Sequence, residues 1–154
     1  LWPAAEQRGV PIALLSDGYL AHVDRIAERH PRLRLIIDHF GVRRGNVDDA
    51  AFASLPDVLA LARHPNVAVK ITGGPQYVSD GYPFVSLLSY YRAIHGQFGP
   101  NRMFWGTDIT RMPCTWRECV TAFTEHQTWC PPQDMRIIMG DGIRQWLGWP
   151  SHTE

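Results

Sequence analysis

The sequence predicts an α/β protein in which parallel strands alternate with helices, and three observations support this class. Four apolar segments of strand length lie at residues 10–15, 33–39, 67–72 and 102–108. Each is followed by apolar residues at helical spacing, an alternation typical of parallel βα units. Hydrophobic residues make up 45% and charged residues 19% of the 154 positions, the balance of a folded chain rather than of a disordered one or a coiled coil.

The helices are predicted from apolar residues spaced three and four apart. The buried positions expected in the four helices are, in chain order, Leu20, Val23 and Ala27; Phe52, Leu55, Leu59 and Ala62; Leu87, Tyr91, Ile94 and Phe98; and Val120 and Phe123. A capping box at residues 115–118 starts the fourth helix. We expect two short helices to close the chain: one after residues 131–132 that ends at Gly140, and one capped by Asp141 that ends at Gly148.

Charge and cysteine content exclude several partners. Fifteen basic and fifteen acidic residues are interspersed, so nothing favours nucleic acid or an anionic membrane surface. The sequence contains no run of about 20 apolar residues and does not open with a signal-peptide pattern, so we expect no membrane partner. The cysteines, Cys114, Cys119 and Cys130, are odd in number, which suits a reducing compartment. We therefore expect a cytoplasmic protein that acts on a small molecule.

Functional residues of parallel α/β proteins gather where strands end. Polar residues stand at the carboxyl ends of all four predicted strands: Ser16 and Asp17, Asp38 and His39, Lys70 and Thr72, and Thr107 and Asp108. Strand alternation predicts that His39 shares a face with Leu35 and Ile37. Taken alone, His39 is as well explained by a structural role. Asp108 points more strongly to function, because burying an unpaired carboxylate is costly.

Four segments carry a resemblance to a known family. They are residues 36–41 (IIDHFG), 67–73 (VAVKITG), 102–108 (RMFWGTD) and 137–148 (IIMGDGIRQWLG). In order and spacing they resemble the last strands and last helix of the amidohydrolase-related family. That family consists of (β/α)8 barrels and includes metal-dependent decarboxylases and the metal-independent 2-pyrone-4,6-dicarboxylate lactonase. The resemblance implies that residues 1–154 form a single domain, the C-terminal half of a TIM barrel with strands five to eight, since a whole barrel takes about 250 residues.

The resemblance also implies roles for individual residues. Asp108 matches the aspartate that ends the eighth strand and acts as the base on water, and His39 matches the histidine of the sixth strand. Where metal-binding relatives end strand five with a histidine, this sequence has Ser16. The resemblance thus implies no cofactor; the alternative is zinc or another divalent metal bound by His39 and Asp108, with further ligands from a longer parent chain.

Further side chains are candidates for substrate binding or support. Arg43, Arg111, Tyr77 and Thr72 are predicted to bind substrate, because guanidinium groups suit a carboxylate and aromatic rings suit a planar ring. Lys70 is predicted to share the face of Thr72 and to pair with a carboxylate. Arg44, Tyr82 and Trp105 are weaker candidates for the same pocket. Histidines in the predicted helices, and the cysteines, are not expected to complete a metal site.

Three functions remain open at this point. The first is a hydrolase that opens a lactone, or another cyclic or carboxylated ester or amide, with base-activated water. The second is a divalent-metal-dependent decarboxylase or hydrolase, and the third is a non-catalytic fold fragment or binding module. We also expect a homodimer, or association with a missing N-terminal half, because four strands leave two sheet edges unpaired. In this interpretation the faces bearing Leu35, Ile37, Val69 and Phe104 lie open to water.

Overall fold

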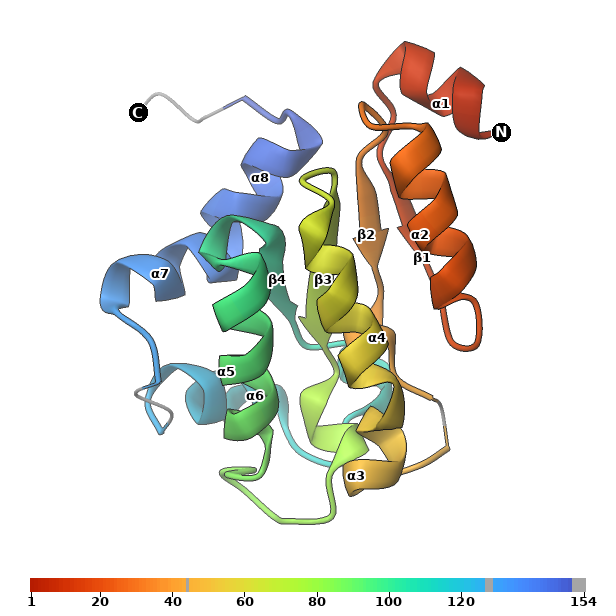
Figure 1. Ribbon diagram of the computed structural model, residues 1–154. Coiled ribbons are helices and arrows are strands. Elements are labelled where there is room, and N and C mark those ends of the chain that lie inside the picture. Colours follow the sequence, from red (N-terminus) through yellow and green to blue (C-terminus); the bar gives the residue numbers. More distant parts are fainter. Residues whose placement is uncertain (44, 127–128, 151–154) are drawn as a thin grey trace.

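Four parallel strands in the order β1-β2-β3-β4 form the centre of the molecule (Figure 1). The computed structural model describes residues 1–43, 45–126 and 129–150. The strands are β1 Ile12–Leu14, β2 Leu35–Ile37, β3 Val67–Thr72 and β4 Met103–Gly106. All three pairings are parallel. The predicted α/β class with four consecutive βα units is confirmed, although β1, β2 and β4 are shorter than the apolar segments that predicted them.

One helix precedes β1, and further helices follow each strand. They are α1 Trp2–Arg8, α2 Leu20–Arg29, α3 Asp48–Ala51, α4 Leu55–Ala60, α5 Leu87–Phe98, α6 Trp116–Thr124, α7 Pro132–Arg136 and α8 Gly142–Leu147. The predicted capping box is confirmed: the Thr115 hydroxyl accepts from Glu118 N, and Glu118 accepts from Thr115 N. The single helix expected around residues 52–62 is instead broken into α4 and short 3-10 turns at Phe52–Ser54 and Leu61–Arg63. None of the described helices is long and apolar enough to cross a membrane.

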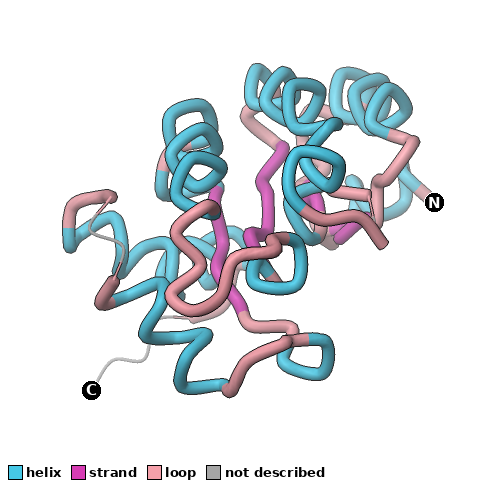
Figure 2. The backbone as a smooth tube through the Cα atoms, turned by 90° about the horizontal axis from the view of Figure 1, so that it is seen from below, coloured by secondary structure: helices cyan, strands magenta, loops and turns pink. Residues whose placement is uncertain are grey.

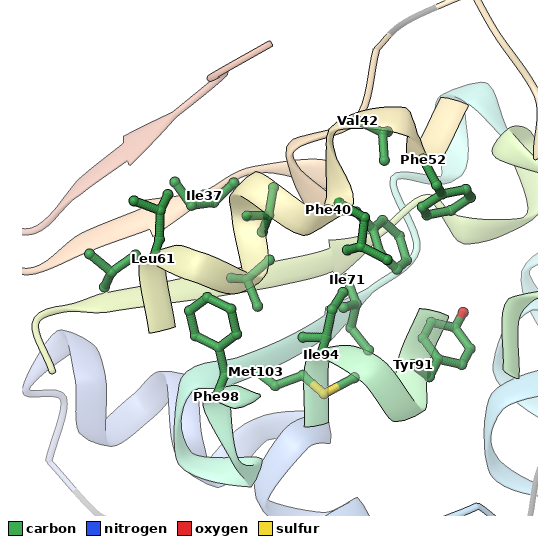
Figure 3. Close-up of a cluster of buried hydrophobic side chains, with 14 of the residues drawn as sticks. Ile37, Phe40, Val42, Phe52, Leu61, Ile71, Tyr91, Ile94, Phe98 and Met103 are labelled. Atoms are coloured by element: carbon green, nitrogen blue, oxygen red, sulfur yellow. The ribbon is translucent and has the colours of Figure 1, made fainter. Parts of the chain in front are cut away.

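The two faces of the sheet meet different partners. The outer face, which packs under α2, α4 and α5 (Figure 1), carries Leu35, Ile37, Val67, Val69, Ile71 and Met103. Figure 3 shows Phe40, Phe98 and Ile94 packed around this face. The inner face carries Ile36, Ala68 and Phe104, which pack against Ile143, Trp146 and Leu147 of α8. The sheet thus has apolar cover on both sides near the starts of its strands.

This packing corrects one expectation. Leu35, Ile37, Val69 and Phe104 were predicted to face water, yet all four are fully buried. The first three belong to the outer face, one residue out of phase with the prediction, and α8 covers Phe104. Among the strand residues, only Ala13 of β1 is exposed to solvent, and Leu15, directly after β1, is 59% exposed.

The C-terminal helices also differ from the prediction. Gly140 and Asp141 do not separate two helices, because a π-helical turn at Ile137–Asp141 joins α7 to α8. Asp141 has right-handed helical backbone angles and makes no side-chain cap. The predicted end at Gly148 is confirmed, since this glycine has the left-handed φ of 72° that terminates helices. The extra residue in the π turn lets Ile138 face the outer core while Trp146 faces the inner one.

Candidate active site

The candidate site lies where the strands end, at the lower edge of the sheet in Figure 1 and toward the viewer in Figure 2. His39 follows β2 and Asp108 follows β4, and β3 lies between these two strands. Despite that separation, His39 Nδ1 lies 3.8 Å from Asp108 Oδ2. The structure therefore brings together the two residues that the sequence ranked highest.

Thr72, at the end of β3, contacts His39. Its Oγ1 lies 2.7 Å from His39 Nδ1, a short hydrogen-bond distance. With the Thr72 hydroxyl as donor, Nδ1 is the acceptor and the proton of the neutral ring sits on Nε2. The predicted placement of Thr72 in the site is thus matched by a defined contact, although that contact is to His39.

Left-handed backbone turns orient both principal residues. His39, Phe40 and Gly41 have successive φ angles of 49°, 59° and 67°, and Asp108 has a φ of 50°. Such angles are unfavourable for residues with a Cβ and are typical of functional sites when the surroundings hold them in place. They explain why one prediction is wrong: His39 does not share the face of Leu35 and Ile37 but turns toward Thr72.

An ion pair lies beside this cluster on the inner face. Lys70 Nζ is 2.5 Å from Asp38 Oδ1, and both side chains are half-buried. The predicted pairing of Lys70 with a carboxylate is therefore confirmed. Because Asp38 already compensates the lysine charge, Lys70 holds the ends of β2 and β3 together rather than presenting a free cation.

Two glycines permit the close approach of these loops. A Cβ on Gly106 would lie 2.9 Å from Thr72 Cγ2, closer than real Cβ contacts allow. A Cβ on Gly73, which has a left-handed φ of 72°, would lie 2.4 Å from Gln76 Nε2 and 3.5 Å from Asp108 Cβ. Gln76 was not predicted as a site residue, and no spacing pattern singles it out. Its Nε2 is buried and has no partner among the described residues.

A cavity of about 220 Å³ opens between the ends of β1 and β2. It is lined by Leu15, Ser16, Asp17, Asp38, His39, Gly41, Val42 and Tyr77. Ser16 is only 2% exposed, and its hydroxyl makes no hydrogen bond with the described residues. Tyr77, predicted to bind substrate, lines the cavity, and its ring packs edge-on against Phe40 and Phe52 in the core. The cavity has room for one small ring.

The remaining substrate-binding candidates occupy other positions. Arg43 Nε lies 3.6 Å from Asp17 Oδ1 at the surface, and the arginine is 67% exposed. Arg111 is exposed in the turn directly after Asp108. The Tyr82 hydroxyl bonds with Thr121 on α6, and Trp105 stacks on Phe123 in the core. Arg44 lies outside the described residues.

Within the described part of the chain, the site does not contain a complete set of metal ligands. No cluster of three His, Cys, Asp or Glu side chains suited to a metal occurs in the described ranges. His39 and Asp108 are two potential ligands, whereas a catalytic zinc site usually takes three protein ligands. The helical histidines serve other partners, for example His64, whose Nε2 lies 2.8 Å from Asp24 Oδ1. Burial raises the pKa of the Cys119 thiol to about 12, so this sulfur stays protonated near neutral pH.

The fold and site together define one half of an α/β barrel with a histidine and an aspartate close together at the carboxyl ends of its strands. The family model for Amidohydrolase (Amidohydro_2) matches residues 1–150. The chain therefore belongs to the amidohydrolase family. Solved structures that resemble it are TIM barrels, and the chain covers about half of their length, which confirms the partial-barrel fold.

The relatives match different shares of the chain. It is 33% identical over 102 residues to L-fucono-1,5-lactonase from Burkholderia ambifaria, a stretch that is 62% of this chain and 33% of the relative. An amidohydrolase from Burkholderia multivorans with bound HEPES matches 97% of this chain and 56% of its own, at 17% identity and a TM-score of 0.80. The structure of that amidohydrolase with bound zinc gives a TM-score of 0.76 at 18% identity.

A third relative is a putative 2-pyrone-4,6-dicarboxylic acid hydrolase from Pseudomonas putida. At 25% identity and a TM-score of 0.69, it matches 99% of this chain and 56% of its own length. The chain thus spans one third of the curated relative and just over half of these solved structures.

Proposed function

We propose that this protein is a hydrolase that opens a lactone ring with water activated by Asp108. The observation that carries this proposal is the contact between Asp108 and His39, whose Oδ2 and Nδ1 lie 3.8 Å apart beside the cavity. A carboxylate beside an imidazole supplies a base and a hydrogen-bond donor within one site. Relatives named as a lactonase and a pyrone-dicarboxylic acid hydrolase support a lactone as substrate.

Each residue has a distinct part in the proposed reaction. Asp108 accepts a proton from water as the water oxygen attacks the lactone carbonyl carbon. His39 donates from Nε2 to the carbonyl oxygen as negative charge develops there, while Thr72 holds Nδ1. The ring C–O bond then breaks, the leaving oxygen takes the proton from Asp108, and the product is a hydroxy acid. Arg111, in the turn after Asp108, and Tyr77, in the cavity wall, are proposed to contact the substrate.

A divalent-metal-dependent hydrolase or decarboxylase is the second candidate. One solved neighbour contains zinc, and His39 and Asp108 are of the residue types that bind it. No group of three His, Cys, Asp or Glu side chains suited to a metal occurs among the described residues, so they do not form a complete zinc site by themselves. A binding module without catalysis is the third candidate, and it predicts no turnover of any substrate.

The test is a proton-release assay on lactones, since ring opening produces an acid. We expect turnover above the spontaneous rate that survives a chelator such as EDTA. Turnover lost with chelator and restored by zinc would favour the metal-dependent candidate. No turnover with a panel of lactones, from protein shown to be folded, would overturn the proposed activity. The assay should use the protein as expressed from its natural reading frame.

We also propose that the sheet associates through its edges, either with a second copy or with the other half of a barrel. β1 and β4 each have one neighbouring strand within the described sheet. Unpaired strand edges favour association. Sedimentation of the 154-residue chain at low micromolar concentration should show a dimer or larger species, and a stable cooperative monomer would refute this.

We also propose that the protein is located in the cytoplasm. Cys114, Cys119 and Cys130 are all free thiols, which suits a reducing compartment. Cell fractionation of the natural producer is the corresponding measurement.

A further inference from the structure

We propose that Lys70, through its ion pair with Asp38, holds His39 in the orientation that the proposed reaction needs, and is thus a positioning residue of this site. The inference rests on the proposed lactonase function for the use of that orientation. Its first measurement, however, detects the placement of His39 without any turnover. The proposal follows from the contacts that join the end of β2 to one face of β3.

Two consecutive residues at the end of β2 contact the same face of β3. Lys70 Nζ lies 2.5 Å from Asp38 Oδ1, and Thr72 Oγ1 lies 2.7 Å from His39 Nδ1. Lys70 and Thr72 are two positions apart on β3, so their side chains share a face. Consecutive side chains of an extended strand point to opposite faces. Asp38 and His39 could therefore not both reach β3 in this way if β2 simply continued.

The backbone at His39 makes this arrangement possible. Asp38 is extended, with a φ of −79° and a ψ of 145°, whereas His39 has a left-handed φ of 49°. That conformation is unfavourable for a residue with a Cβ, so the surroundings must hold it. The ion pair fixes the residue before the turn, and the fully buried Phe40 fixes the residue after it. The imidazole is thus held through its neighbours as well as through its own contact with Thr72.

The burial of the ion pair suits it to this role. The Lys70 and Asp38 side chains are 27% and 16% exposed, so neither charge is fully solvated. Asp38 Oδ1 is buried and accepts no hydrogen bond of good geometry from the described residues, so the lysine charge is its main compensation. Loss of one partner leaves the other charge partly buried and uncompensated, which favours a rearrangement of the turn.

The residue type at this position supports the same interpretation. Lys70 is the only lysine of the sequence, and every other basic residue among the fifteen is an arginine. A lysine ammonium is a compact point charge, whereas the planar guanidinium of arginine is a wide fork that favours two parallel contacts. A compact cation is what a single contact with one buried carboxylate oxygen requires.

The imidazole nitrogens of His39 report its placement directly. Magnetic resonance of protein with isotope-labelled histidine gives the Nδ1 and Nε2 chemical shifts, and His39→Gln identifies the His39 signals. A pH of about 8.5 keeps an ordinary imidazole neutral. Thr72→Val removes the hydroxyl at Nδ1 and gives the shift of a ring without that contact. We expect Lys70→Met to move the Nδ1 signal more than halfway toward its position in Thr72→Val.

A second variant tests the ion pair from its other side. Asp38→Asn keeps the shape of the side chain but removes its charge, so the His39 signal should move in the same direction. Arg63→Met is the matched control, because it removes a cation that lies 2.6 Å from Asp24 in the helical layer. The His39 signal should stay in place in this control. Thermal melts of all variants establish that folded protein is compared.

Kinetics on a lactone test the consequence for the reaction. Lys70→Met should lower kcat about tenfold and leave KM within about threefold, since Lys70 acts on the orientation of His39 rather than on substrate binding. His39 signals at their parental positions in both folded variants would overturn the inference and leave the lactonase function standing. A moved signal with unchanged kcat would overturn it too. If the parent opens no lactone, the proposed function fails, and the nitrogen signals still decide whether Lys70 holds His39.

Discussion

Along β3 the side chains alternate between two kinds of environment. Val67, Val69 and Ile71 are fully buried in the outer core under the helices. Lys70 and Thr72, on the other face, are only half-buried, and both contact polar groups from the β2 end of the sheet. One strand thus stabilises the fold with one set of residues and positions the site with the other. The two sets should respond differently to substitution.

Removal of the proposed base should produce the largest effect on the site. Asp108→Asn keeps the shape of the side chain but cannot accept the proton, so turnover should fall by about two to four orders of magnitude. Initial rates on a lactone, with a thermal melt on the same sample, measure both properties. The melting temperature should stay close to that of the parent. Asp141→Asn, which alters an exposed carboxylate paired with Arg136, is the matched control; near-parental turnover in Asp108→Asn would refute the assignment.

A truncation on the outer face should have the opposite profile. Ile71→Ala removes a fully buried side chain next to Ile94 and Met103 (Figure 3) and should lower the free energy of unfolding by about 2–5 kcal/mol. Turnover per folded molecule should hardly change. Urea unfolding and active-site titration measure the two quantities. Val85→Ala, at an exposed valine, should cost about 0.5 kcal/mol or less. A loss of turnover larger than the loss of folded protein would mean that the faces are not independent.

An intermediate effect is expected from Thr72, which ends the strand on the inner face. Thr72→Val keeps the volume but removes the hydroxyl that contacts His39, so kcat should fall about tenfold and the pH profile of kcat should shift. Thr72→Ser should restore most of the activity, because it retains the hydroxyl. Thr124→Val, at an exposed helical threonine, is the control. An unchanged pH profile in Thr72→Val would show that Thr72 does not orient the imidazole.

The smallest effect concerns an ion cluster on the helical layer, far from the inner face. The hydrogen bond from His64, followed by the charges of Arg63 and His64, lowers the pKa of Asp24 below 3.8. The stabilisation is therefore present above pH 3.8 and is lost as the pH falls through the lowered folded-state pKa. Because the group is partly exposed, the loss should be about 1 kcal/mol or less. In urea unfolding, the difference in stability between Asp24→Asn and its parent should be smaller at pH 3 than at pH 6; a constant difference would argue against this linkage.

Periodicity explains which parts of the fold the sequence could predict. Apolar spacing located all four strands and the buried stripes of α2 and α5, because burial on one side of an element imposes that spacing. The alternation of side chains along β3 likewise predicted that Lys70 and Thr72 lie on the same face of the sheet. The helix α1 was not predicted, since its seven residues bury only Ala5 and leave no stripe to detect.

The geometry of the candidate site depends on features that leave no periodic pattern in the sequence. The orientation of His39 follows from left-handed backbone angles at non-glycine residues, which tertiary contacts impose. Buried polar atoms without described partners, at Ser16 and Gln76, are visible only once the loops are packed. The juxtaposition of His39 and Asp108 was expected from the family resemblance, whereas the contact between Thr72 and His39 required the structure.

The π turn between α7 and α8 makes the chain length in that segment a determinant of packing. Each residue of an α-helix advances the helix by about 100°. Deleting one residue at Gly140 would restore an ordinary α-helical turn and rotate α8 by about that angle relative to α7. Trp146 and Leu147 would then lose their contact with Phe104. The inner face of the sheet would lose the apolar residues that cover it away from the site. A one-residue deletion that keeps every side chain of α8 would thus change the register of an entire layer, so this segment should tolerate substitutions better than changes in length.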